Sequence, residues 1–341
     1  MITIPNLSTY NSIESARTLK ANLILNQEPK VKFNLTAIRN CDPFAMIIVG
    51  LAIRDILHDR EVIAENLNDI NDYAGSMCFY DFIGVKNLGL KVNSRSGSTK
   101  HIPITIVRKS ILMEKCRNQN KEFIDALREY SFRVAKVLSR NYPESEIAFE
   151  YLIREMIRNI FEHSESECAY ICGQYWPSYD LIEIAIADDG IGIKNSLKSN
   201  MNYINLIEND NDAIKLAMRP GVSKSYSKSE NPIFNPDKNS GFGLYVVSEL
   251  CIALDGSFII TSGRNSKHIG RSSENSGLLI KESISNHNGT AIMIRIKPTM
   301  LVDFDNIFDS IIEKGEELAK QDKLAFSKSS SLSRKLSRDL Y

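Results

Sequence analysis

The stretch Arg154-Glu155-Met156-Ile157-Arg158-Asn159-Ile160-Phe161-Glu162-His163 is the first of three short motifs that decide the fold. A helix from about residue 144 is predicted here because apolar residues recur every three or four positions, at Ile147, Leu152, Met156 and Ile160. On such a helix Glu155, Asn159 and His163 are spaced by four and share one polar stripe. A carboxylate and an amide there can hold a water and a Mg²⁺ ion, although a solvated helix face would show the same pattern.

The second motif, Ile186-Ala187-Asp188-Asp189-Gly190-Ile191-Gly192-Ile193, follows a predicted strand at 181–187. Asp188 is therefore placed at the end of a strand, and the two glycines allow the backbone to approach a ligand closely. A carboxylate fixed there can accept a hydrogen bond from an amino group such as that of adenine. A tight Asp-Asp-Gly turn without a ligand would have the same sequence.

The third motif, Asn239-Ser240-Gly241-Phe242-Gly243-Leu244-Tyr245-Val246-Val247, precedes and opens a predicted helix at 244–254. Unpaired backbone N–H groups and the helix dipole at such an N-terminus can bind phosphate. A glycine-rich helix start without a ligand is the alternative. The motif is neither a P-loop nor a dinucleotide fingerprint, because it has neither Gly-Lys-Ser/Thr nor G-x-G-x-x-G.

Together and in this order, the three motifs resemble the GHKL, or Bergerat-fold, ATP-binding domain of sensor histidine kinases, type II topoisomerases, a large heat-shock chaperone and mismatch-repair ATPases. The resemblance covers about 102–300 and implies a two-layer α/β sandwich that binds ATP and Mg²⁺. It implies roles for eight residues: Glu155 as the general base, Asn159 as the Mg²⁺ ligand, Asp188 as the adenine-binding carboxylate, Gly190 and Gly192 as the turn beneath the base, Gly241 and Gly243 at the phosphates, and Thr290 at the adenine pocket. His163 would orient its neighbours.

Residues 193–240, between the two glycine motifs, form a polar segment that we call the lid. A segment of this length and polarity is typical of a functional or mobile region. Its side chains Arg219, Lys224 and Lys228 could reach a γ-phosphate when the lid closes, but lysines in a polar loop are often only solvated. Ordering of the lid by ATP would make a two-state element.

The first 92 residues are predicted to form a smaller α/β domain, with a strand at 30–35 and a helix at 45–57. The stretches at 40–46 and 73–84 resemble STAS domains, which are partners of serine-kinase ATPases. Pro43 and Phe44 stand where such domains usually carry the phosphorylated serine, so we expect a binding role without phosphorylation there.

The rest of the chain divides into smaller parts. We expect a linker at 93–101, a C-terminal helix at 301–326 and a basic, Ser-rich, disordered tail at 327–341. Residues 263–288 are expected to be a polar excursion within a hairpin.

Composition narrows the class of protein further. The 341 residues include 42 basic and 42 acidic side chains, so there is no strong signal for nucleic acid or an anionic membrane. No apolar run is long enough to span a bilayer, and the N-terminus lacks the pattern of a secretion signal. Six scattered cysteines are expected to be reduced thiols. We expect a cytoplasmic protein that binds a protein partner or forms a homodimer.

Features outside the three motifs separate the possible activities. The predicted helix at 121–139 has no histidine, which argues against a conventional histidine kinase. About forty residues follow Thr299, too few for the transducer domain of the longer members. The expected function is a Mg²⁺-dependent, ATP-hydrolysing switch whose lid closure is read by the N-terminal domain or a partner. A serine/threonine kinase of the anti-sigma type and a non-hydrolysing ATP sensor are the alternatives.

Overall fold

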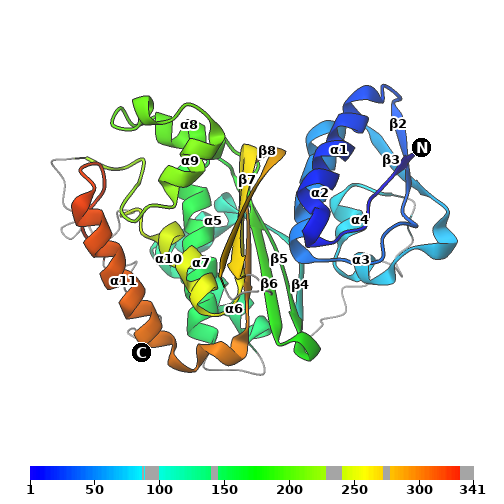
Figure 1. Cartoon of the computed structure of the whole chain (residues 1–341). Coiled ribbons are helices and arrows are strands. Elements are labelled where there is room, and N and C mark those ends of the chain that lie inside the picture. Colours follow the sequence, from blue (N-terminus) through cyan, green and yellow to red (C-terminus); the bar gives the residue numbers. More distant parts are fainter. Residues whose placement is uncertain (87, 89–99, 140–144, 228–239, 272–276, 331–341) are drawn as a thin grey trace.

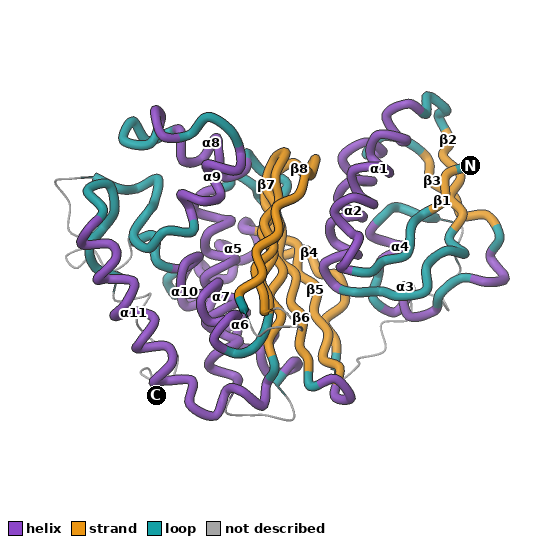
Figure 2. Tube along the Cα trace, in the orientation of Figure 1, coloured by secondary structure: helices purple, strands orange, loops and turns teal. Residues whose placement is uncertain are grey.

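The computed structural model describes residues 1–86, 88, 100–139, 145–227, 240–271 and 277–330. These residues form a mixed α/β protein with a parallel three-stranded sheet and an antiparallel five-stranded sheet (Figures 1 and 2). The prediction of an α/β protein is therefore confirmed. Most of the predicted linker, at 93–99, and residues 331–341 of the predicted tail lie outside the described residues.

The N-terminal unit contains the smaller sheet, in the order β1-β2-β3, and four short to medium helices. Its elements are β1 (Ile2–Thr3), α1 (Ser12–Leu25), β2 (Lys30–Asn34), α2 (Pro43–Leu57), β3 (Glu61–Glu65), α3 (Asp72–Ser76) and α4 (Phe79–Phe82). The predicted strand and helix correspond to β2 and α2. Proline suits the first turn of α2 because its missing N–H would have no partner there. Almost every residue of α2 is buried, which fits its strongly apolar sequence.

The larger sheet has the strand order β4-β5-β6-β8-β7. Its strands are β4 (His101–Arg108), β5 (Cys168–Trp176), β6 (Leu181–Ala187), β7 (Ser257–Arg271) and β8 (Leu278–Ile296). The helices of this part are α5 (Lys109–Gln119), α6 (Phe123–Leu138), α7 (Glu146–His163), α8 (Gly192–Lys198), α9 (Asp210–Ala217), α10 (Gly243–Ala253) and α11 (Phe304–Gln321). The helix that carries the first motif is α7, and the third motif opens α10.

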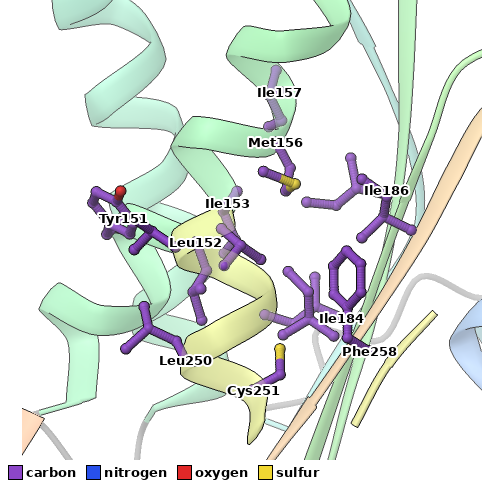
Figure 3. Close-up of a cluster of buried hydrophobic side chains, with 14 of the residues drawn as sticks. Tyr151, Leu152, Ile153, Met156, Ile157, Ile184, Ile186, Leu250, Cys251 and Phe258 are labelled. Carbon is purple, nitrogen blue, oxygen red and sulfur yellow. The ribbon is translucent and has the colours of Figure 1, made fainter. Parts of the chain in front are cut away.

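One face of the larger sheet packs against α7 and α10 (Figure 3). Alternate residues of β6, namely Ile182, Ile184 and Ile186, point to this side because successive side chains of a strand face opposite ways. They join Met156 of α7 and Leu250 of α10 in one apolar cluster. This packing fixes α7 against the end of β6 and the neighbouring residues of β8.

The opposite face of the larger sheet packs against the N-terminal unit, as Figure 1 shows. Ala185 and Ala187 of β6 and Met293 of β8 share a core with α2. Both faces of the sheet are therefore buried, which accounts for the apolar character of both residue sets in its central strands. None of the described helices is long and apolar enough to cross a bilayer.

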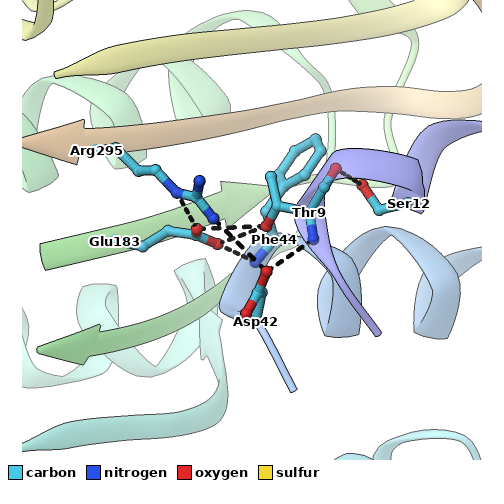
Figure 4. A network of polar contacts seen from close by, with 6 residues as sticks. All are labelled: Thr9, Ser12, Asp42, Phe44, Glu183 and Arg295. Carbon is cyan, nitrogen blue, oxygen red and sulfur yellow. Dashed lines mark hydrogen bonds and ion pairs between the residues drawn. The ribbon is translucent and has the colours of Figure 1, made fainter. Parts of the chain in front are cut away.

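A buried polar network ties the two parts together at Glu183 of β6 (Figure 4). Its carboxylate accepts hydrogen bonds from the backbone N–H of Phe44, at 2.8 Å, and from Nε of Arg295, at 2.6 Å. The Thr9 hydroxyl also donates to it, at 3.2 Å. A carboxylate at the N-terminus of α2 is favourable because the helix dipole is positive there. Burial raises the pKa of Glu183, whereas Arg295 opposes that rise.

Two segments differ in form from the sequence-based expectation. Residues 263–271 and 278–288, expected to be a polar excursion, instead continue β7 and β8 as a paired ribbon with irregular register near Gly263. The C-terminal helix ends at Gln321, after which residues 322–330 fold back over the molecule. Within the predicted tail, Ser329 and Ser330 are buried, because they bond to groups on α11 and beside the third motif.

Candidate functional site

A cavity lies between α7, α10 and the face of the larger sheet on which these two helices pack. The lid covers part of the cavity. It contains about 800 Å³ of empty space, part of which is open to solvent. Predicted site residues from four parts of the chain line it: Asn159, Asp188, Gly192, Gly241, Gly243 and Thr290. The fold therefore brings together residues that are widely separated in the chain, from Asn159 to Thr290.

Aliphatic side chains make up much of the cavity wall. They come from α7, from β6, β7 and β8, and from the lid: Ile160, Ile186, Ile193, Leu197, Val222, Ile260 and Ile292. A largely apolar wall with a few polar groups is typical of a small-molecule site, in which the polar groups orient the ligand.

Asp188 is the buried carboxylate of the cavity, with only 1% of the residue exposed. Its Oδ1 accepts a hydrogen bond from the backbone N–H of Gly190, at 2.9 Å. Its own N–H donates to the carbonyl of Thr290, at 2.8 Å, which joins β6 to β8 at this point. Burial raises the pKa of Asp188 to about 7, although backbone hydrogen bonds from Gly190 and Thr290 oppose the rise. A ligand that donates a hydrogen bond would stabilise the ionised form.

The start of α10 lies directly against α7, and Gly243 makes that approach possible. A Cβ atom at Gly243 would lie 2.8 Å from Oε2 of Glu155 and 3.7 Å from Nδ2 of Asn159. Gly241 has a φ of +75°, in the left-handed region that favours glycine. The two glycines therefore place the N-terminal backbone of an eleven-residue helix at the cavity wall.

Two further polar side chains line the cavity, one at the end of α7 and one in the lid. His163 lies one turn after Asn159, and Lys224 of the lid lies near it. Burial, together with the positive charges of Lys224 and Arg158, lowers the pKa of His163 to about 3. The imidazole is therefore neutral at physiological pH, and Lys224 supplies the positive charge here.

Glu155 and Gly190, two of the predicted site residues, do not line the cavity. Glu155 is buried behind Gly243, and its Oε1 accepts a hydrogen bond from Nη1 of Arg154 at 2.8 Å. Gly190 instead packs against the end of α7, where a Cβ would lie 2.0 Å from the carbonyl oxygen of Ser164. Gly190 therefore shapes the turn after β6 from outside the cavity.

The three basic residues singled out in the lid have different positions. Lys224 lines the cavity, whereas Arg219 is largely exposed and lies 3.7 Å from a carboxylate oxygen of Asp322. Lys228 lies outside the described residues. Only one of these three cations is therefore seen to line the cavity.

Ser262 of β7 does not line the cavity, but it supports two segments that do, and the sequence does not reveal this role. Its hydroxyl accepts a hydrogen bond from the N–H of Ile193, at 3.0 Å, and donates to the carbonyl of Gly289, at 2.9 Å. It thus joins the first residues of the lid to the segment before Thr290. No local pattern marks this serine, because its role depends on pairing between β7 and β8.

Comparison with known proteins adds no relative to this description: no protein-family model matches the chain, and no curated protein matches it significantly.

Proposed function

We propose that the protein binds ATP together with Mg²⁺ in the cavity between α7, α10 and the sheet, and uses it as a regulatory switch. The observation that carries this proposal is the meeting of Asp188, Asn159 and the start of α10 at one partly apolar cavity. The order of the motifs and their likeness to the GHKL family support the same assignment, with a Bergerat-type arrangement for 102–300 and a STAS-like one for 1–92.

Each part of the cavity would have a separate task toward the nucleotide. Asp188 would accept a hydrogen bond from the amino group of adenine, and the aliphatic wall would enclose the ring. The backbone N–H groups at the start of α10 would bind phosphate oxygens, since those groups have no partner within the helix. Lys224 would add a positive charge from the lid.

The residues present fit a Mg²⁺ ion that is held mainly by the nucleotide. In the ranges that the structure describes, no three acidic, histidine or cysteine side chains are grouped to hold a metal by themselves. Mg²⁺ usually keeps several waters and takes few protein ligands beside phosphate oxygens, so one amide oxygen from Asn159 is a suitable partner. When bound, the ion would neutralise charge on the phosphates.

Glu155 decides between a hydrolase and a sensor with little turnover. Its carboxylate is buried, and one oxygen is engaged by Arg154. A general base must come within hydrogen-bond distance of the attacking water, directly or through one further water. The position of Glu155 behind Gly243 favours slow turnover unless nucleotide binding rearranges the start of α10. A nucleotide-sensing role is therefore the second candidate.

The binding proposal is tested by calorimetric titration with Mg²⁺ and a non-hydrolysable ATP analogue. Asp188→Asn should weaken binding by about tenfold or more, because the amide places a donor where an acceptor is needed. Asp189→Asn is the matched control, since this neighbouring carboxylate bonds to Ser166 and Tyr170 and does not line the cavity. No binding by the unaltered protein, or equal affinity in both variants, would refute the proposal.

Turnover is tested with ATP labelled at the γ-phosphate. Free labelled phosphate would support hydrolysis, and stable label on a protein would support the kinase alternative. Tight binding with neither product would support the sensor. In the hydrolysis case, Glu155→Ala should abolish phosphate release and leave nucleotide affinity unchanged.

A further inference from the structure

Residues 322–330, which follow α11, pack against the lid, although Lys323, Ser327 and Lys328 are exposed. Ala325 and Phe326 are buried, with 7% and 3% of each residue exposed, and so are Ser329 and Ser330. In Figure 1 the C-terminal helix α11 lies on the side of the sheet away from the N-terminal unit, and it packs against α10. The segment is thus placed to affect the lid.

Three hydrogen bonds connect this segment to the lid. The Tyr203 hydroxyl donates to the carbonyl of Leu324 at 2.8 Å, and the Tyr226 hydroxyl donates to the carbonyl of Lys323 at 3.0 Å. The N–H of Phe326 donates to the carbonyl of Gly221 at 2.8 Å. These bonds involve lid residues that are more than twenty positions apart, so the segment holds the lid at separate points.

Phe326 supplies the apolar part of the contact. Its ring packs edge-on against Tyr226, with the ring centres 5.1 Å apart, and Tyr226 lies beside Tyr203. The backbone of Phe326 lies so close to Gly221 that a Cβ there would be 2.2 Å from the Phe326 carbonyl oxygen. A buried aromatic ring with backbone hydrogen bonds on the same residue makes a specific contact.

The far end of the segment reaches the third sequence motif. The N–H of Ser330 donates to the hydroxyl of Ser240 at 2.9 Å, and Ser240 directly precedes Gly241 of the cavity wall. Both the N–H and the hydroxyl of Ser329 donate to Oε1 of Glu316, each at 2.9 Å, which secures the segment to α11. The segment therefore contacts both the lid and the residue at the start of the phosphate-facing glycines.

The lid segment at 221–224 contacts Phe326 on one side and lines the cavity on the other. Val222, Ser223 and Lys224 face the cavity, directly after Gly221. An outward movement of this segment would have to break the contact between Gly221 and Phe326. The exit of a molecule from the cavity is thereby linked to the release of residues 322–330.

We propose that residues 322–330 form a latch that holds the lid over the cavity and so controls nucleotide exchange at the site. This inference rests on the proposed function, whose regulation it specifies. Coupling between two sites is reciprocal, so a bound nucleotide should also hold the latch in place. The position of the lid would then affect the C-terminal segment, which contacts it. The N-terminal unit, in contrast, packs on the other face of the sheet.

The test measures dissociation of a fluorescent ATP analogue with Mg²⁺ and amide hydrogen exchange of the lid. Phe326→Ala and deletion of 322–341 should each speed dissociation by about tenfold, the usual size of a coupling that rests on a few contacts. Both changes should also speed exchange in 203–226 without nucleotide. Deletion of 331–341 alone and Leu318→Ala, an exposed residue of α11, are the matched controls and should change neither quantity.

The two readouts separate failure of the latch from failure of ATP binding. If the unaltered protein binds no nucleotide, the proposed function fails, but faster lid exchange in the Phe326→Ala protein would still support the latch. Equal lid exchange in the unaltered and Phe326→Ala proteins would overturn the latch, whatever the nucleotide affinity. Equal dissociation rates despite faster lid exchange would also overturn it, because the contact would then not control exchange.

Discussion

Asp188 and Asp189 are adjacent in the chain, but their carboxylates belong to opposite sides of the larger sheet. Asp188 is buried in the cavity, whereas Asp189 bonds to Ser166 and Tyr170 and lines a separate cleft beside the N-terminal unit. The sequence predicts which of the two is the site residue because Asp188 comes first after the strand. It does not predict the environment of Asp189, which depends on docking of the N-terminal unit.

The titration of Asp188 should make ligand affinity depend on pH. With its pKa raised to about 7, the carboxyl group is increasingly protonated below pH 7 and cannot then accept from an amino group. Affinity for the ATP analogue should therefore rise as pH increases from 6 to 7 and level off above about pH 7.5. Calorimetric titration over this range measures the effect.

The comparison with Asp188→Asn isolates this effect from titration of the nucleotide itself. The difference in binding free energy between the two proteins should shrink as the pH falls below 7. A difference that stays constant from pH 6 to 8 would contradict the assignment. In the ligand-free protein, the free energy of unfolding should change in the opposite direction. Because the pKa of Asp188 is higher in the folded state, its protonated form contributes stability below about pH 4, and this contribution is lost as the pH rises to about 7.

At the scale of elements, helices with a clear apolar stripe could be predicted from the sequence, and those without one could not. The helices α2, α6, α7, α10 and α11 match expected segments within a few residues. Helix α5 is not predicted because it buries only Leu112 and Cys116. In α1 a buried Lys20 interrupts the apolar stripe. Lys20 is buried because Asp55 of α2 pairs with it at 2.5 Å, a contact that sequence spacing does not encode.

The candidate site divides in the same way. A strand end at Asp188 and a helix start at Gly243 could be predicted as local features, but only the resemblance to a known family predicts that the three motifs meet. Glu155 and Gly190, which the resemblance also includes, do not line the cavity. The pairing of Glu155 with Arg154 could not be predicted from the sequence. Charged residues are common on exposed helix faces, and nothing in the sequence indicates that Arg154 is completely buried. Contacts of the lid with 322–330 join segments about a hundred residues apart, and no local pattern marks them.

Helix α7 contains a buried ion cluster whose cation should be essential for stability. Arg154 donates from Nε to Glu150 and from Nη1 to Glu155, both at 2.8 Å, and none of the three is appreciably exposed. Arg154→Met should lower the free energy of unfolding by ~3–5 kcal/mol, because two buried carboxylates would lose the cation that they share. Urea unfolding measures this loss.

Arg117→Met on α5 is the control for loss of an arginine, since Arg117 is exposed. It should change the free energy of unfolding by no more than about 0.5 kcal/mol. Equal stability of the Arg154→Met and Arg117→Met proteins would show that the cluster contributes nothing to the folded state.

At the scale of the whole molecule, the N-terminal unit contacts the larger sheet close to Thr290 of the cavity wall. Lys20 donates to the carbonyl of Asn286 at 3.3 Å, and Asn288 donates to Asp55 at 2.7 Å. Both contacts lie within four residues of Thr290, which lines the cavity. The N-terminal unit therefore contacts one wall of the site from behind, while the C-terminal segment contacts the lid.

The shared core implies that the N-terminal unit and the larger sheet unfold together. Phe44 of α2 is fully buried, and its N–H bonds to Glu183 of the larger sheet. Phe44→Ala should therefore destabilise both parts by ~3–5 kcal/mol, the usual cost of such a cavity. The single tryptophan, Trp176 of β5, reports on the sheet by fluorescence, and circular dichroism reports on the whole chain.

The two signals should show coincident transitions in urea, both shifted to lower urea by Phe44→Ala. Ile24→Ala, at a half-exposed position of α1, should leave them almost unchanged. If Phe44→Ala left the Trp176 transition in place, the N-terminal unit would be an independently folding module docked on a self-sufficient sheet. Its contacts near Asn286 and Asn288 could then form and break without unfolding. A coincident shift would instead mean that the N-terminal unit and the sheet behind Thr290 unfold as one cooperative unit.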